Sequence, residues 1–142
     1  MLEKNKGFTL IELMLVVIII GILVSMVVPR LAGRSEQARR AAANADINAN
    51  ISTALDVYEL DNGQYPTTEQ GLKALVSKPD TSPTPTNWNG PYIKKIPLDP
   101  WGRAYIYKSP SDHNQDYDLY SLGRDGIESA DDVTNWQSET SP

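Results

Sequence analysis

The sequence predicts an α+β protein in which a long N-terminal α-helix packs against a small antiparallel β-sheet. Three observations lead to this prediction. The chain opens with a long apolar segment, continues into a segment with helical periodicity, and later contains two short tyrosine-rich segments separated by a turn. Its 142 residues suffice for one domain, and the absence of cysteine excludes a disulfide as a source of stability.

The apolar segment covers residues 8–28 and predicts a transmembrane helix. Its only polar residues are Thr9, Glu12 and Ser25, and a helix of this length spans roughly 31 Å, which matches a hydrocarbon core. A secretory signal peptide is the alternative, but its apolar region is about 7 to 15 residues long and precedes a small-x-small cleavage site. Here Pro29 and Arg30 follow instead. A carboxylate at a bilayer centre costs about 2.5 to 3.5 kcal/mol, so Glu12 needs a partner or a function.

The next segment, about residues 30–61, predicts an amphipathic helix. Apolar residues recur along it at intervals of three and four, at Ile47, Ile51, Leu55 and Tyr58. Pro29 either kinks the helix between the two segments or leaves it continuous. Gly63, which tolerates a positive φ, ends it.

The remainder, residues 62–142, predicts the sheet and its loops. A capping box from Thr67 to Gln70 opens a short helix over 67–75. Six prolines make residues 79–100 a loop, with one short strand from Tyr92 to Ile96. Residues 103–109 and 117–123 form an antiparallel hairpin.

Charge is unevenly distributed around a net value of −5. From Pro110 onward Arg124 is the only lysine or arginine, whereas four arginines follow the apolar segment. This layout argues against a nucleic-acid-binding protein. Counted by the positive-inside rule, it favours a cytoplasmic C-terminal domain.

Catalysis has little support in the sequence. His113 is the single histidine and is expected to be a solvent-exposed loop residue. Without cysteine or a second histidine, the usual nucleophile and metal-hydrolase arrangements cannot form, so we predict that the protein is not an enzyme. The turn at residues 99–102 is expected to pack Trp101 on the domain, and the tyrosines to belong to the sheet and core.

An acidic loop, residues 122–132, is the other candidate site. Three of its residues are aspartates, whose hard oxygens suit Ca²⁺ together with backbone carbonyls. Its spacing does not match an EF-hand, and composition alone favours a solvated acidic loop.

The segment Lys6-Gly7-Phe8-Thr9-Leu10-Ile11-Glu12 resembles the processing signal of type IV pilin-like proteins. The resemblance implies cleavage after Gly7 by a prepilin peptidase and methylation of the new N-terminus at Phe8. Three further blocks, at 55–75, 90–102 and 117–126, resemble the major pseudopilins of the type II secretion system. The implied fold is pilin-like, and the implied protein is a structural subunit that polymerises in the periplasm to drive export of folded proteins across the outer membrane.

The resemblance also implies an organisation. Residues 1–7 would be a leader, 8–28 a transmembrane and filament-core helix, and 29–142 a periplasmic domain. The protein would cross the bacterial inner membrane once. A periplasmic C-terminal domain conflicts with the charge count, which favours a cytoplasmic one. The implied partners are other copies of the chain, minor pseudopilins, the inner-membrane assembly platform, the prepilin peptidase and, before assembly, membrane lipid. A type IV pilin for adhesion or motility is an alternative, which the lack of a C-terminal disulfide pair and the SLGRDG sequence disfavour. A signal-anchored periplasmic protein is another.

Two sets of site residues follow. In a bundle of these helices, Glu12 could pair with the amine at Phe8 of an adjacent subunit, which would make it a register device. In the acidic loop, the resemblance implies Ca²⁺ bound by the side chains of Asp125 and Asp132. Further implied ligands are the carbonyls of Leu122, Ile127 and Ser129 and, as an additional candidate, Asp131. The loop is shorter than in many members of the family.

Overall fold

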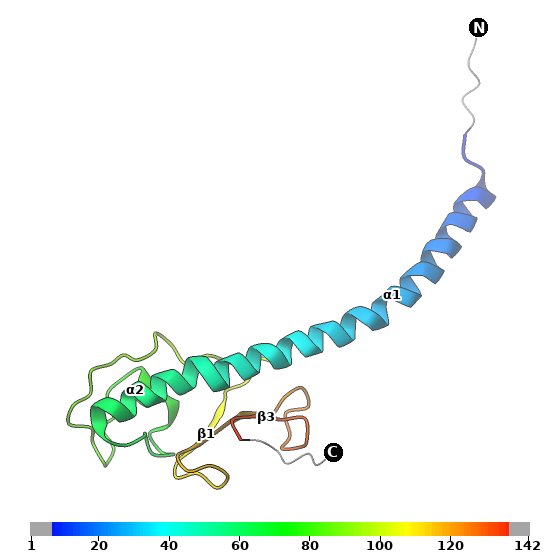
Figure 1. Ribbon diagram of the computed structural model, residues 1–142. Helices are drawn as coiled ribbons and strands as arrows, with labels where there is room; N and C mark the ends of the chain where they lie inside the picture. The colour runs from blue at the N-terminus through cyan, green and yellow to red at the C-terminus, as the bar shows by residue number, and fades with distance from the viewer. Residues whose placement is uncertain (1–6, 137–142) are drawn as a thin grey trace. The chain divides into compact units, whose positions relative to one another are not determined.

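The computed structural model describes residues 7–136, without the side chains of residues 27–32. The leader predicted at 1–7 therefore lies, apart from Gly7, outside the described residues. The chain divides into two compact units, Met1–Ala38 and Arg39–Pro142. Helix α1, Leu10–Ala45, is a single element that includes Pro29, so the backbone stays helical through the proline (Figure 1).

The second unit begins with the end of α1 and continues through a π-helical turn, η1 (Asp46–Ile51), into helix α2 (Ser52–Asn62). The apolar face predicted for this segment is confirmed, because Ile47, Ile51, Leu55 and Tyr58 are each at most 2% exposed. Gly63 ends α2 as predicted, with a φ of 76° and its N–H donating to the Glu59 carbonyl at 2.6 Å. The π turn was not predicted.

The capping box is confirmed, but the helix that follows it differs from the prediction. The Thr67 N–H donates to Gln70 Oε1 at 3.1 Å, and the Gln70 N–H donates to Thr67 Oγ1 at 3.2 Å. Gly71 then adopts a φ of +56°, which interrupts the right-handed conformation. The helix is therefore a short 3₁₀ helix, η2 (Gly71–Leu75), instead of a helix over 67–75.

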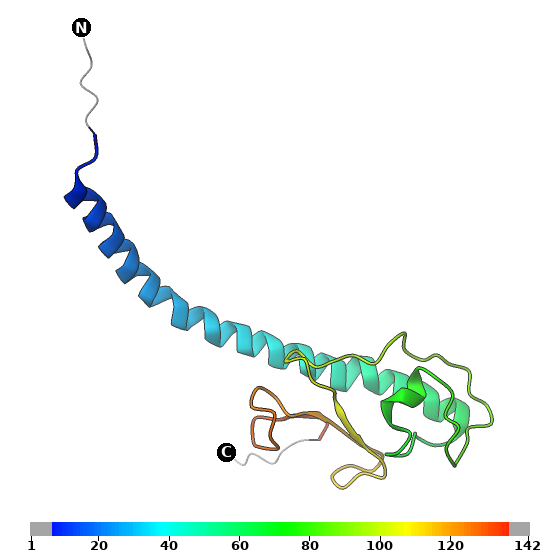
Figure 2. The same cartoon turned by 180° about the vertical axis from the view of Figure 1, so that it is seen from behind.

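The predicted hairpin is confirmed as strands β1 (Ile106–Lys108) and β2 (Asp118–Ser121), which pair antiparallel with Tyr107 opposite Leu119. A third strand, β3 (Val133–Thr134), pairs antiparallel with β2 and gives the order β1-β2-β3. The prediction did not include β3. Figures 1 and 2 show the strands on one side of α2.

The strand predicted from Tyr92 to Ile96 is wrong. The N–H groups of Tyr92 and Ile93 both donate to the Leu75 carbonyl, at 2.7 and 3.3 Å. In a β ladder, two successive N–H groups point to opposite sides, so this shared acceptor requires a bend. The nearest ladder contact in this part of the chain is a single bridge between Leu98 and Ala104.

One hydrophobic core joins the helical segment to the sheet. Tyrosines from the sheet region bury their rings in it and place their hydroxyls on polar partners, as buried tyrosines require. The Tyr105 hydroxyl donates to Asp46 Oδ2 at 2.9 Å, and that of Tyr107 donates to the Pro66 carbonyl at 2.7 Å. Trp101 packs against the core from a turn in which Asp99 Oδ1 accepts the Trp101 and Arg103 N–H groups, as predicted.

Candidate functional site

The N-terminal segment contains the first group of predicted site residues, Gly7, Phe8 and Glu12. Thr9 and Glu12 form a capping box at the start of α1: Glu12 Oε2 accepts the Thr9 N–H at 3.4 Å, and Thr9 Oγ1 accepts the Glu12 N–H at 3.3 Å. Phe8, next to this cap, is 78% exposed. Glu12 therefore has a role within its own chain, at the helix N-terminus, that the sequence analysis missed.

The first part of α1 is apolar and uncovered. Every large apolar side chain described from Leu10 to Met26 is at least 46% exposed. Within the described stretches of the chain, no helix has the length and apolarity needed to cross a membrane. The span predicted over residues 8–28 includes two residues whose side chains are not described, and it stays a prediction.

The acidic loop, residues 122–132, connects β2 to β3. Two glycines with positive φ shape it, Gly123 at 63° and Gly126 at 72°. A Cβ at Gly123 would lie 3.0 Å from both the carbonyl and Oδ2 of Asp131, so the two ends of the loop meet closely there. Glycine is required at these turns for conformation and for space.

Two carboxylates of the loop share one hydroxyl. Ser129 Oγ lies 3.2 Å from Asp125 Oδ2 and also contacts Asp131 Oδ1. A serine hydroxyl has a single proton, so it can donate to only one of them at a time. The hydrogen bond from Ser129 is the main cause that lowers the pKa of Asp131, and it favours the ionised form of that carboxyl.

Asp132 differs from its neighbours. Its Oδ1 is buried and has no hydrogen-bond partner within residues 7–136. Burial raises the pKa of Asp132, and the nearby carboxylates of Asp131, Asp125 and Glu128 raise it further. A buried carboxylate oxygen without a donor is costly, and a cation at this point would relieve the cost.

The carbonyls predicted as ligands differ in their surroundings. The Leu122 carbonyl accepts the Gly126 N–H at 3.2 Å, and that of Ser129 accepts the Asp132 N–H at 3.3 Å. The Ile127 side chain is 67% exposed. Among the residues that the structure describes, no three acidic, histidine or cysteine side chains form a group that could hold a metal ion. The donors are nevertheless all oxygens, which suits Ca²⁺ by ligand type.

Two arginines contact the acidic loop, and the sequence analysis did not find them. Arg40 Nη1, on α1, donates to the Asp131 carbonyl at 2.6 Å. Arg103 Nη1 donates to the Gly123 carbonyl at 2.8 Å. Arg40 is separated from Asp131 by 91 residues, so no local pattern could reveal the contact.

His113 is exposed, as predicted, but it has partners. Its Nδ1 lies 2.9 Å from Oδ2 of the buried Asp118, and its ring stacks on Trp136 with centroids 4.2 Å apart. Ser111 Oγ bonds to Asp118 and not to the imidazole, so the three residues lack the order of a catalytic triad.

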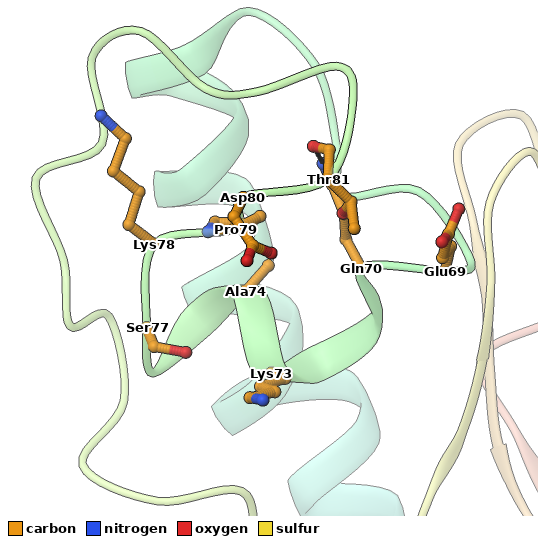
Figure 3. Close-up of a pocket in the computed structure, with 9 residues that line it drawn as sticks. All are labelled: Glu69, Gln70, Lys73, Ala74, Ser77, Lys78, Pro79, Asp80 and Thr81. Carbon is orange, nitrogen blue, oxygen red and sulfur yellow. Dashed lines mark hydrogen bonds between the residues drawn. The ribbon is translucent and has the colours of Figure 1, made fainter.

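A pocket of about 300 Å³ lies beside η2. Figure 3 shows Lys78 and Glu69 on opposite sides of it. Its lining includes two lysines and two acids, so it has no net charge to select an ion, and it contains no nucleophile paired with a base.

Comparisons with known proteins identify the family of the chain. The family described as "Type II secretion system (T2SS), protein G" matches residues 30–136, and the "Prokaryotic N-terminal methylation motif" matches residues 3–28. Proteins named type II secretion system core protein G are similar along nearly their whole length. The one from Pseudomonas aeruginosa is 50% identical, covering 96% of this chain and 98% of its own. The one from Vibrio cholerae is 51% identical, covering 95% and 94%.

A solved structure extends the likeness to three dimensions. It is the crystal structure of the major pseudopilin from the type 2 secretion system of enterohaemorrhagic Escherichia coli. That chain is 42% identical and superposes with a TM-score of 0.69, over 79% of this chain and 95% of its own. The chain therefore belongs to the family of type II secretion system protein G, the major pseudopilins, whose known role is to polymerise into the secretion pseudopilus.

Proposed function

We propose that this pseudopilin is cut between Gly7 and Phe8 by a prepilin peptidase, methylated at Phe8, and held in the inner membrane by residues 8–28 with its C-terminal domain in the periplasm. The match of residues 3–28 to the N-terminal methylation motif supports the processing step. Copies would then leave the membrane and polymerise with the help of the assembly platform and minor pseudopilins, so that the growing pseudopilus drives folded proteins through an outer-membrane channel.

The exposed apolar surface of α1 is the observation that carries this proposal. Its side chains from Leu10 to Met26 are uncovered in the single chain, and such a surface requires lipid or other helices as neighbours. The same residues can serve both states, because the interior of a helix bundle and a hydrocarbon core are similarly apolar. The helix would therefore exchange lipid for other copies of itself.

Glu12 would distinguish the two states. Among the described residues, the donor to its carboxylate is the Thr9 N–H, at the long distance of 3.4 Å. A free amine at Phe8 of an adjacent subunit would be a stronger partner, because a hydrogen bond between two ionised groups is about twice as strong as a neutral one. The pair forms only if neighbouring subunits are in register, so Glu12 would favour correctly assembled filament over membrane.

A comparison of Glu12→Leu and Glu12→Gln tests this role. Leucine removes both the cap and the charge, whereas glutamine keeps a capping oxygen and removes only the charge. We expect both variants to be inserted and cleaved at Gly7, and both to fail in pseudopilus assembly and in secretion of a folded exoprotein. Normal assembly by Glu12→Gln would show that the cap, and not the intersubunit pair, is what matters.

We further propose that the acidic loop binds Ca²⁺. Asp125 and Asp132 would supply side-chain oxygens and Asp131 a further one, with carbonyls from Leu122, Ile127 and Ser129. Two observations support this: Asp132 Oδ1 has no partner among the described residues, and the single Ser129 hydroxyl can donate to only one of Asp125 and Asp131 at a time. The bound ion would stabilise the connection from β2 to β3.

Thermal unfolding of the full chain in detergent tests the calcium proposal. A free calcium concentration 100 times Kd should stabilise the protein by about 2.7 kcal/mol relative to chelator. Asp132→Asn should abolish this difference. It should also raise the melting temperature in chelator, because it removes a negative charge whose buried Oδ1 has no donor among the described residues. Equal melting of the wild type in calcium and in chelator would contradict the proposal.

A further inference from the structure

Arg40 and Arg103 bind the acidic loop in an unexpected way. The loop has four carboxylates, at Asp125, Glu128, Asp131 and Asp132, yet both guanidiniums donate to backbone carbonyls. Arg40 bonds to the carbonyl at one end of the loop and Arg103 to the carbonyl at the other. The ion pairs found among the described residues, Lys108–Asp112 and His113–Asp118, both lie outside the loop.

The loop is built around these contacts. A Cβ at Gly126 would lie 2.7 Å from Arg103 Cζ, so the guanidinium packs directly on the glycine. A Cβ at Gly123 would lie 3.0 Å from the Asp131 carbonyl, which is the oxygen that Arg40 binds. An arginine therefore holds each end of the loop, and glycines at 123 and 126 leave the space that these contacts need.

We propose that Arg40 and Arg103 are positioning residues that clasp the backbone of the acidic loop and leave its carboxylate oxygens free for a cation. This inference rests on the calcium proposal made above. A guanidinium on a carboxylate would occupy the oxygens that a cation needs. On a carbonyl it attracts the loop by charge and fixes the backbone without using those oxygens.

The sign of a mutational effect separates this role from simple electrostatics. Removing a positive charge near a cation site strengthens cation binding if charge alone matters. Removing a residue that orients the ligands weakens it, typically by about 10 to 100-fold. If Arg40 and Arg103 act as this clasp, removing either arginine should weaken calcium binding, even though it makes the surroundings of the loop more negative.

Isothermal calcium titration of the full chain in detergent measures this sign. We expect Arg40→Ala and Arg103→Ala each to lower calcium affinity by at least about tenfold. Arg40→Lys, which keeps one donor for the carbonyl, should retain most of it. Arg39→Ala and Arg124→Ala are charge-matched controls, since both side chains are exposed and neither donates a described hydrogen bond. These two variants should leave the calcium affinity unchanged or slightly higher.

Hydrogen exchange in chelator separates a failure of the clasp from a failure of the calcium proposal. The Gly126 and Asp132 amides are hydrogen-bonded within the loop and should exchange faster in Arg40→Ala and Arg103→Ala than in the controls. If the wild type binds no calcium but exchange still depends on the arginines, the calcium proposal falls and the clasp stands. If the wild type binds calcium and the two variants bind it equally well or more tightly, the clasp falls.

Discussion

Asp118 is a buried carboxylate that its neighbours keep ionised. It is 2% exposed and accepts bonds from the Ser111 hydroxyl, the Asp112 N–H and the His113 side chain. Burial by itself raises the pKa of Asp118, but the bonds from Ser111, His113 and Asp112 outweigh it, and the pKa lies below its usual value. The stabilisation from ionised Asp118 is therefore present above the unfolded pKa of about 3.9 and is lost as pH falls through the folded pKa.

Asp118→Asn should lower the free energy of unfolding at pH 7 by roughly 2 kcal/mol, because several donors lose a charged acceptor. The difference from wild type should begin to shrink as pH falls below about 4 and should disappear below the lowered folded pKa of Asp118, where the wild-type carboxyl is also neutral. Urea unfolding of the full chain in detergent at several pH values measures both effects. Asp116→Asn is the control, since Asp116 is an exposed acid two residues away. Equal losses from the two variants would contradict this account.

At the scale of elements, the buried face of η1 and α2 carries most of the helical contribution to the core. Ile47, Ile51 and Leu55 are at most 1% exposed, whereas Leu60 on the same helical segment is 80% exposed. Packing and not helix propensity decides which of these positions matter, because a helix this short is marginal without tertiary contacts.

Ile51→Ala should destabilise the protein by about 2 to 5 kcal/mol, since it removes apolar contacts and leaves a cavity. Leu60→Ala on the same segment should change stability by less than about 0.5 kcal/mol. Chemical denaturation of both variants tests the pair. A loss at Leu60 as large as that at Ile51 would indicate a buried environment for Leu60 that the single chain does not have.

What the sequence could predict depended on how far each pattern extends. The buried face of η1 and α2 was predictable because four apolar residues recur along it at intervals of three and four. The hairpin was predictable because two tyrosine-rich segments flank a turn. Strand β3 has two residues, so it has no periodicity of its own and exists only through pairing with β2. The arginine contacts to the acidic loop join distant segments of the chain, and neither spacing nor composition encodes them.

For the whole molecule, the two units differ in how they are stabilised. None of the described residues of Met1–Ala38 is buried, whereas all the core residues belong to Arg39–Pro142. The first unit must bury its apolar surface against lipid or other subunits, while the second buries its own. The second unit should therefore fold without the first.

A fragment that begins at Arg34 should be soluble without detergent and unfold cooperatively. A fragment that begins at Ser52 should not fold, because it lacks Ala43, Ile47 and Ile51, which are at most 1% exposed in the core. Circular dichroism melting of the two fragments measures the difference. A cooperative transition in the shorter fragment would show that the sheet and α2 alone are sufficient.

The π turn at η1 also determines in which direction around the helix axis the side chains at the end of α1 point. Deleting one residue from Asp46–Ile51 would convert it to regular α-helix and rotate the preceding residues by about 100° around the helix axis. Arg40 would then point away from the Asp131 carbonyl, although no residue that contacts the loop had been changed. The extra residue of the π turn thus rotates the end of α1 so that Arg40 faces the acidic loop. The conformation of the loop therefore depends on the helical geometry of Asp46–Ile51, a segment that does not include Arg40 itself.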